Sequence, residues 1–378
     1  MQKSKATKVR ELISNGAVMI PGVPNASMAR QVEQAGFDAV YVSGAGLANS
    51  TAGVPDIGLL WRDEVVRLAS YVAHAVRIPA IVDADTGFGE GEAVARTIRE
   101  LEKAGLAGCH IEDQEFPKRC GHLDGKTIVD ARMMVARIKA AAAARADKDF
   151  LIIARTDARA AEGFDGALER ASEYLVAGAD AIFPEALQST DEFRDFAKEI
   201  DLPLMANMTE FGKSPLLTFQ QLADFGYRMI IFPQSAFRIS MKGSAKFFAA
   251  LKEAGTQNDW LDQMQTRQEL YDLLDYDPAA DEFRDFAKEI DAPLMANMTE
   301  FGKSPLLTFQ QLADFGYRMI IFPQSAFRIS MKASAKFFAT LKKAGTQNDW
   351  LDQMQTRQEL YDLLDYNPAA EEWKGFRD

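Results

Sequence analysis

Two acids directly after a short apolar stretch are the first residues whose types and spacing could do chemistry. Asp83 and Asp85 follow Val82 with one alanine between them. On an extended chain, side chains two residues apart point to the same side. Two carboxylates this close repel each other unless a cation or a proton lies between them. Oxygen ligands suit a hard ion such as Mg²⁺, with Mn²⁺ as a second candidate. The pair therefore predicts a metal site; the alternative is two solvated loop acids.

A third acid and a cysteine loop extend this cluster. Glu112 ends another apolar stretch at an equivalent place, so we expect it to bind the same ion. Cys120 follows shortly, and its close neighbours in the sequence are Lys118, Arg119 and His122. Because nearby cations favour the thiolate form of a cysteine, this loop predicts a reactive thiol. The alternative is a loop cysteine without a role.

More polar residues follow the apolar stretches farther along the chain. We expect these to face the same site: Ser43, Arg155, Asp157, Glu185 and Asn207. Arg155 could hold a substrate carboxylate through two parallel hydrogen bonds, or make a structural salt bridge to Asp157 or Glu185. Asn207 and Thr209 offer neutral donors, and Arg238 could hold a second carboxylate.

Eight short apolar stretches must position these residues. They cover 17–20, 39–42, 80–82, 108–111, 150–153, 181–183, 203–206 and 229–232. Each is too apolar to alternate with water, as is typical of buried parallel strands, and helix-like stretches such as 92–104, 131–144 and 166–176 separate them. Eight strand–helix units predict a (β/α)₈ TIM barrel, whose active sites form at the carboxyl ends of the strands. An open doubly wound sheet would favour a glycine-rich phosphate loop, and residues 87–89 lack the third glycine of that motif.

Composition excludes some classes of function. The 378 residues include 43 basic and 55 acidic side chains, a formal charge of −12, which argues against nucleic acid as a partner. No apolar run approaches the roughly 20 residues that cross a bilayer. The chain has two cysteines, Cys109 in an apolar stretch and Cys120 in its loop, and one disulfide could not stabilise a chain this long. We therefore expect free thiols in a reducing cytoplasm.

The C-terminal part of the chain is a near-exact repeat. Residues 191–280 recur at 281–370 with five differences, which indicates a duplication or an engineered fusion. Each copy contains strands seven and eight and the closing helices, and a barrel has room for one set. Because short connections are the rule, we expect a barrel domain over 1–280 that the first copy completes. Residues 281–378 would then be surplus, with apolar strands at 294–296 and 319–322 that must dock, pair with another chain or exchange between protomers.

With these motifs in hand, the chain resembles the isocitrate lyase/phosphoenolpyruvate mutase superfamily, and its 2-methylisocitrate lyase members most. The resemblance covers about residues 8–275 and rests on segments 41–44, 55–58, 82–89, 110–114, 118–122, 154–158, 183–186, 207–212 and 233–238. It implies a (β/α)₈ barrel, a dimer or tetramer with an exchanged C-terminal helix, and a small polycarboxylate substrate. The expected reaction is Mg²⁺-dependent cleavage of 2-methylisocitrate, or a close 2-hydroxy acid, to pyruvate and succinate.

The resemblance also implies a role for each matching residue. Catalysis falls to Cys120, Tyr41, Arg155 and Glu185; substrate binding to Ser43, Gly44, Arg119, Gly121, His122, His110, Asn207, Thr209 and Arg238; and metal binding to Asp83, Asp85, Glu112 and Asp56. The cysteine at 120 distinguishes lyases from phosphoenolpyruvate mutases. Carboxyphosphonoenolpyruvate or phosphoenolpyruvate phosphonomutase chemistry, dimethylmalate cleavage and an inactive, swapped variant remain alternatives. Ala45 departs from the lyase pattern, which usually has a glycine there, and this leaves fine substrate specificity open.

Overall fold

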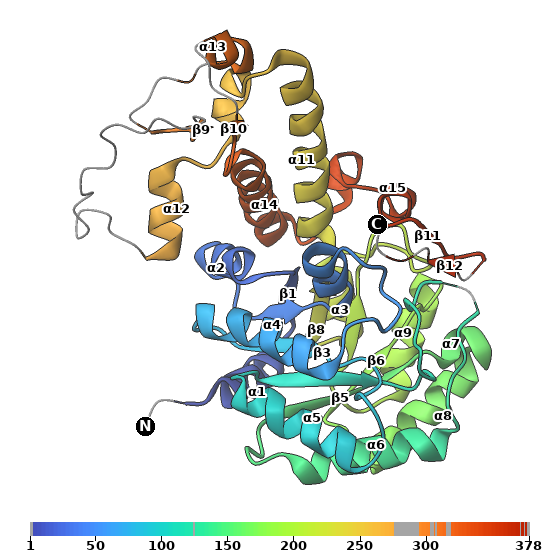
Figure 1. Ribbon diagram of the computed structural model, residues 1–378. Helices are drawn as coiled ribbons and strands as arrows, with labels where there is room; N and C mark the ends of the chain where they lie inside the picture. The colour runs from blue at the N-terminus through green and yellow to red at the C-terminus, as the bar shows by residue number, and fades with distance from the viewer. Residues whose placement is uncertain are drawn as a thin grey trace.

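Eight parallel strands form a barrel. The computed structural model describes residues 3–123, 125–275, 295–302, 306, 308–314, 319–370, 372–373 and 375. The strands of the barrel are β1 (Val18–Val23), β2 (Val40–Val42), β3 (Ala80–Asp83), β4 (Gly108–Glu112), β5 (Leu151–Thr156), β6 (Ala181–Pro184), β7 (Met205–Asn207) and β8 (Met229–Phe232). Their order is β6-β5-β4-β3-β2-β1-β8-β7, and a parallel bridge between Ile182 and Leu204 joins the two ends. The predicted (β/α)₈ TIM barrel is confirmed (Figure 1).

Helices surround the barrel in alternation with the strands. They are α1 (Lys5–Asn15), α2 (Ala26–Gln34), α3 (Gly44–Leu47), α4 (Arg62–Ala75), α5 (Glu92–Lys103), α6 (Ala131–Ala144), α7 (Ala158–Ala161), α8 (Gly163–Val176), α9 (Thr190–Glu199) and α10 (Phe219–Phe225). Side-chain caps begin several of them: Ser4 accepts from Thr7 N–H at α1, and Thr218 forms a capping box at α10. Such caps satisfy the free N–H groups of a first helical turn.

The core has two layers, as the alternation of strand side chains requires. Inside the barrel, buried apolar residues such as Ile20, Ile81, Ile153 and Met229 pack together. The opposite faces of the strands, for example Val82 and Ile152, pack against the helices. The strands are thus buried on both faces, which explains why their sequences are continuously apolar. Several run a few residues beyond the predicted ends, so that β5 includes Arg155 and β4 includes Glu112.

The repeat adds a second, smaller assembly beside the barrel. From the first copy come α11 (Ser235–Ala254), the 3₁₀ turn η2 (Asn258–Gln263) and α12 (Arg267–Leu274). From the second come β9 (Met295–Asn297), α13 (Phe309–Asp314), β10 (Met319–Ile321), α14 (Ser325–Ala344), the 3₁₀ turn η4 (Asn348–Gln353), α15 (Arg357–Leu363), β11 (Tyr366–Asn367) and β12 (Glu372–Trp373). β9 and β10 pair only with each other among the described strands. The predicted boundary at 280/281 and Leu294 lie outside the described residues.

The long helices α11 and α14 lie side by side and link the two assemblies (Figure 1). The β9–β10 pair lies away from the barrel, whereas α15 and β11 lie at its rim. The α12 helix reaches α2, where Arg30 Nη1 donates to the Leu273 carbonyl at 3.2 Å. The barrel strands seven and eight therefore come from the first copy, and the elements at the rim come from the second. In the described part of the chain, none of the helices has the length and apolarity to cross a membrane.

Candidate active site

A cleft opens at the carboxyl ends of the barrel strands. It encloses about 730 Å³ of empty space, part of which is open to solvent. Most of the predicted site residues line it: Tyr41, Ser43, Asp56, Asp83, Cys120, Gly121, His122, Arg155, Glu185, Asn207, Thr209 and Arg238. The strand ends thus bring together residues almost 200 positions apart, as expected for a TIM barrel.

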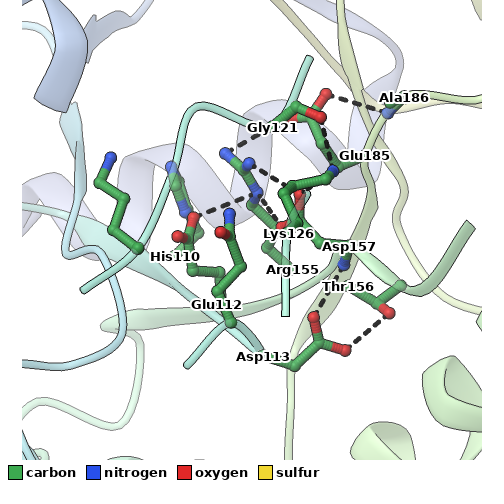
Figure 2. Close-up of polar contacts among 12 residues, drawn as sticks. His110, Glu112, Asp113, Gly121, Lys126, Arg155, Thr156, Asp157, Glu185 and Ala186 are labelled. Carbon is green, nitrogen blue, oxygen red and sulfur yellow. Dashed lines mark hydrogen bonds and ion pairs between the residues drawn. The ribbon is translucent and has the colours of Figure 1, made fainter. Parts of the chain in front are cut away.

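Arg155 lies at the centre of the charges at the base of the cleft (Figure 2). Its Nε lies 2.9 Å from Asp157 Oδ2 and 3.3 Å from Glu112 Oε2, and its Nη1 lies 3.2 Å from Glu185 Oε2. The guanidinium also stacks over the Phe183 ring, 5.1 Å from its centroid. Arg155 is 7% exposed and lines the cleft. Both predictions for this side chain, a salt bridge and a carboxylate ligand, are compatible with this position.

Glu185 is held as a charged carboxylate. Burial would raise its pKa, but Arg155 and then His122 outweigh burial and place the pKa of Glu185 well below the usual range. His122 Nε2 lies 2.9 Å from Glu185 Oε1, and His122 Nδ1 accepts the Lys213 N–H at 3.1 Å. Asn207 Nδ2 lies 3.3 Å from both Glu185 oxygens. Glu185 is therefore ionised and directed by three neighbours.

Gly121 is the residue that lets the cysteine loop approach this cluster. A Cβ added at this position would lie 2.6 Å from Glu185 Cγ and would collide with Arg155. The loop is further fixed by Lys126, whose Nζ lies 2.6 Å from Asp157 Oδ1 and also bonds the Gly121 carbonyl at 2.5 Å. The glycine is thus required because any side chain would displace the charged groups beneath it.

The acids predicted to bind a metal surround a lysine. Lys118 Nζ is ion-paired with Asp56 and lies 2.8 Å from Asp85 Oδ1. Asp83 accepts the Asp85 N–H at 2.9 Å. Burial, against the pull of Lys118, raises the pKa of Asp85 to about 6. Within the described residues, no three His, Cys, Asp or Glu side chains form a group that could hold a metal ion, so the acids reach the rim without converging on one point.

Glu112 keeps an oxygen without a partner even though Arg155 Nε lies 3.3 Å from its Oε2. The side chain is fully buried, and its Oε1 has no hydrogen-bond partner. Burial raises the pKa of Glu112 well above its usual value, even though Arg155 opposes the rise. A buried carboxyl group with a free oxygen requires either a proton or a cation. The oxygens of Asp83, Asp85 and Glu112 are of the chemical type that a hard divalent ion prefers, although in this structure Lys118 lies beside Asp85 and the three acids do not form a coordinating group.

Tyr41 and His110 form a neutral pair on the wall below. The Tyr41 hydroxyl and His110 Nε2 are 2.7 Å apart. Burial lowers the pKa of His110 to about 4, although Asp83 opposes this shift. Burial and then Asp83 raise the pKa of Tyr41 well above the usual value. At neutral pH the Tyr41 hydroxyl therefore keeps its proton and acts as a hydrogen-bond donor.

Three predicted binding residues occupy supporting positions. Ser43 Oγ accepts the Gly46 N–H at 3.1 Å and so caps α3, and it also accepts a bond from Gln234. Gly44 packs on Asp83, because a Cβ there would lie 2.8 Å from Asp83 Oδ2. Arg119 is directed toward the C-terminal segment, where its Nη2 donates to the Pro368 carbonyl at 3.0 Å. Gly44 and Arg119 are absent from the described lining of the cleft.

The second copy of the repeat contributes an unpredicted wall of the cleft. Arg357 Nη1 lies 3.3 Å from Cys120 Sγ and 3.4 Å from the Tyr361 hydroxyl. Leu360, Tyr361 and Tyr366 line the cleft as well. No signal in the sequence distinguishes Arg357 from its repeat equivalent Arg267. Lys118 is a further residue whose site contacts only the structure revealed, whereas the ion pair between Arg155 and Asp157 was one of the predicted alternatives.

Arg238 is buried at the junction between this wall and the barrel. Its Nη1 donates to the Gln355 carbonyl at 2.7 Å, and its guanidinium lies over the Phe211 ring at 5.4 Å. Glu210 Oε2 lies 3.7 Å from Arg238 Nε. Burial lowers the pKa of Arg238 although Glu210 opposes this shift. Arg238 thus offers a buried guanidinium group where the barrel meets the C-terminal wall of the cleft.

The fold and the site together define an enzyme of the (β/α)₈ class, with carboxylates and a thiol at the rim of its barrel. The family model described as phosphoenolpyruvate phosphomutase matches residues 9–252. The chain belongs to this family.

Relatives and solved structures agree with this assignment. A 2-methylisocitrate lyase of Aeropyrum pernix is 51% identical over 269 residues, which is 71% of this chain and 86% of that protein. A 2-methylisocitrate lyase of Bacillus subtilis is 44% identical over 276 residues, 73% of this chain and 91% of that protein. A crystal structure of 2,3-dimethylmalate lyase, a member of the PEP mutase/isocitrate lyase superfamily, has a TM-score of 0.70 at 35% identity and covers 72% of this chain and 92% of its own. Phosphonopyruvate hydrolase in complex with oxalate and Mg²⁺ has a TM-score of 0.66 at 30% identity and covers 72% and 95%.

Proposed function

We propose that this chain is a carbon–carbon lyase that cleaves 2-methylisocitrate to pyruvate and succinate. The observation that carries the proposal is the Cys120 thiol on the wall of a cleft whose base holds Arg155 and the buried acids. Relatives named as 2-methylisocitrate lyases at 51% and 44% identity support the same reaction. The two free cysteines suit a reducing cytoplasm, which we propose as the location.

The reaction divides into two proton transfers. The substrate hydroxyl loses its proton to the Glu185 carboxylate, which is ionised and lines the cleft. The adjacent C–C bond then breaks, and the hydroxyl carbon becomes the carbonyl of pyruvate. The electron pair of the broken bond passes to the departing fragment, which takes a proton at carbon to form succinate. We assign that second proton to the Cys120 thiol, because this thiol lies on the wall of the cleft and a positioned acid is the usual source of such a proton.

The remaining residues bind and orient the substrate. Arg155 and Arg238 are two buried guanidinium groups on the cleft, and each can hold a carboxylate through charge-assisted hydrogen bonds. The Tyr41 hydroxyl donates a hydrogen bond to a substrate oxygen. Glu185, ionised at neutral pH, orients His122 and Asn207 at the cleft wall.

A divalent ion completes this proposal. Asp83, Asp85 and Glu112 would hold Mg²⁺, with Asp56 next to them, because Glu112 is buried with a free oxygen and Asp85 keeps a raised pKa. When bound, Mg²⁺ would stabilise negative charge on the substrate's hydroxyl and carbonyl oxygens. A solved relative with Mg²⁺ supports the choice of ion.

The test is a comparison of substrates with the full chain and Mg²⁺. We expect release of a 2-oxo acid from 2-methylisocitrate, at a kcat/KM at least tenfold above that for 2,3-dimethylmalate and for phosphonopyruvate. Faster turnover of phosphonopyruvate would replace the proposal with P–C chemistry, and faster turnover of 2,3-dimethylmalate would change the substrate. Absence of turnover on all three would refute the lyase proposal.

A further inference from the structure

The end of the second copy lies on the barrel. The Gly345 carbonyl accepts the Phe219 N–H at 2.8 Å, and Gln347 Nε2 donates to the Met208 carbonyl at 2.5 Å. Gln355 N–H donates to the Arg238 carbonyl at 3.0 Å. In each of these bonds one residue belongs to the second copy and the other to the strands or helices of the first.

The end of the first copy makes the same bonds to the second. The Gly255 carbonyl accepts the Phe309 N–H at 3.0 Å, and Gln257 Nε2 donates to the Met298 carbonyl at 2.9 Å. Gln265 N–H donates to the Arg328 carbonyl at 3.2 Å, the counterpart of the Gln355–Arg238 bond. Every residue here is the repeat equivalent, 90 positions away, of a residue in the first set. The two copies have therefore exchanged their C-terminal segments, 255–274 and 345–364.

The exchange follows from the direction of the long helices. α11 begins at the barrel with Ser235 and ends at Gly255, beside Phe309 of the second copy. α14 lies against α11 and α2 and ends at Gly345, beside Phe219 of the barrel. A straight helix of 20 residues spans roughly 30 Å, so α11 carries Gly255 and the start of its own segment away from the point where the helix begins. The end of that segment, in α12, contacts α2 on the outside of the barrel.

The cleft needs the exchanged segment. Arg357, which bonds Cys120 Sγ, follows Gly345 in the second copy. Its equivalent Arg267 follows Gly255 in the first copy and lies near Arg328 of the second, whose pKa is lowered by burial first and by Arg267 in addition. One copy on its own would thus place Arg267 away from the barrel to which it is joined.

We propose that the repeat makes this exchange internal: the second copy closes the cleft of its own chain, so that a single chain forms a complete site without a segment from another chain. A chain with one copy would have to obtain the closing segment from a second chain. The proposal concerns assembly and does not depend on which substrate the cleft binds.

Engineered disulfides in the full chain test the proposal without an activity assay. A Cβ at Gly345 would lie 3.2 Å from Phe219 Cβ, and one at Gly255 would lie 3.6 Å from Phe309 Cβ, close to the roughly 3.5–4.5 Å of disulfides. Cys120→Ser removes the cleft thiol from the background. After oxidation, Phe219→Cys with Gly345→Cys should link within one chain: its two engineered thiols should no longer react with an alkylating reagent in urea, and the chain should keep the mass of 41.9 kDa on a non-reducing gel. Phe309→Cys with Gly255→Cys should do the same.

A crossed pair supplies the matched control. Phe219→Cys with Gly255→Cys would link within one chain only if the first copy closed its own barrel, so we expect it to stay unlinked. A linked crossed pair would overturn the exchange. Covalent pairs of chains from Phe219→Cys with Gly345→Cys would show that the segment comes from another chain and would also overturn the proposal. No link in that variant would contradict the contact itself.

The repeat also provides a functional comparison. Arg357→Leu should lower kcat/KM at least tenfold, whereas Arg267→Leu should stay within about twofold of the unchanged chain. Arg357→Lys, which keeps the positive charge, should recover part of the loss, and this separates a charge effect from a folding defect. Equal effects of the two leucine substitutions would refute the assignment of Arg357 to the cleft.

Discussion

Two phenylalanines with identical neighbours in the sequence should differ sharply in their contribution to stability. Phe338 on α14 is 0% exposed and meets Phe37 of the barrel with ring centroids 6.3 Å apart. Phe248 is its repeat equivalent on α11 and is 56% exposed. Truncation of a fully buried phenylalanine costs about 3–5 kcal/mol, whereas an exposed site changes stability by about 0.5 kcal/mol. We therefore expect Phe338→Ala to cost about 3 kcal/mol more than Phe248→Ala.

Urea unfolding followed by circular dichroism measures this difference. Helix propensity cancels, because both substitutions have the same flanking residues in a 20-residue helix. A second pair serves as control: Phe247 and Phe337 are each 1% exposed and pack on Trp260 and Trp350 at 5.7 Å, so their alanine variants should be equally destabilised. A difference below about 1 kcal/mol between Phe338→Ala and Phe248→Ala would refute the packing of α14 on the barrel.

Four further outcomes follow from the site. Cys120→Ser should lower kcat by roughly 10²–10⁴-fold, which is the range for loss of a positioned acid. An assay of 2-oxo acid release measures this, and an unchanged kcat would remove the thiol from the mechanism. Chelation with EDTA should abolish turnover and added Mg²⁺ should restore it; activity that survives dialysis against EDTA would contradict the metal site. Burial raises the pKa of the Cys109 thiol, so alkylation should label one thiol in the native chain and two in urea; two in the native chain would contradict the buried position. The pKa of Glu185 is lower in the folded protein than its unfolded value of about 4.3. The charge of Glu185 therefore stabilises the fold fully above about pH 4.3, and this stabilisation is lost as the pH falls through the folded pKa. Glu185→Gln should therefore cost more stability at pH 7 than at pH 3 in thermal unfolding, because part of the benefit is already lost at pH 3. An equal cost at both would contradict the shift.

The barrel and most of its rim follow from local features of the sequence. Short apolar stretches such as 80–82 and 229–232 could be assigned as strands because both faces of a parallel strand are buried. A polar residue after such a stretch, for example Arg155 after 150–153, then has to reach the rim of the barrel. This reasoning found cleft residues such as Ser43, Asp83, Glu185 and Asn207 without knowledge of their partners.

The sequence alone could not predict which distant side chains contact each other. Lys118 was recognised as a neighbour of Cys120, yet its ion pairs reach back to Asp56 and Asp85. The sequence gives no weight to one copy of a repeat over the other, so Arg357 and Arg267 were indistinguishable. Their positions depend on where α11 and α14 end in space, which is a property of the packed molecule.

The covalent link between the two copies has a consequence for dilute solutions. A site that is completed by a segment of a second chain becomes incomplete when the protein is diluted, because the two chains dissociate at low concentration. A closing segment on the same chain instead contacts the barrel at an effective concentration of roughly millimolar. The bonds from Gly345, Gln347 and Gln355 to the barrel therefore persist at any dilution, and the activity per chain should be the same at nanomolar and micromolar protein.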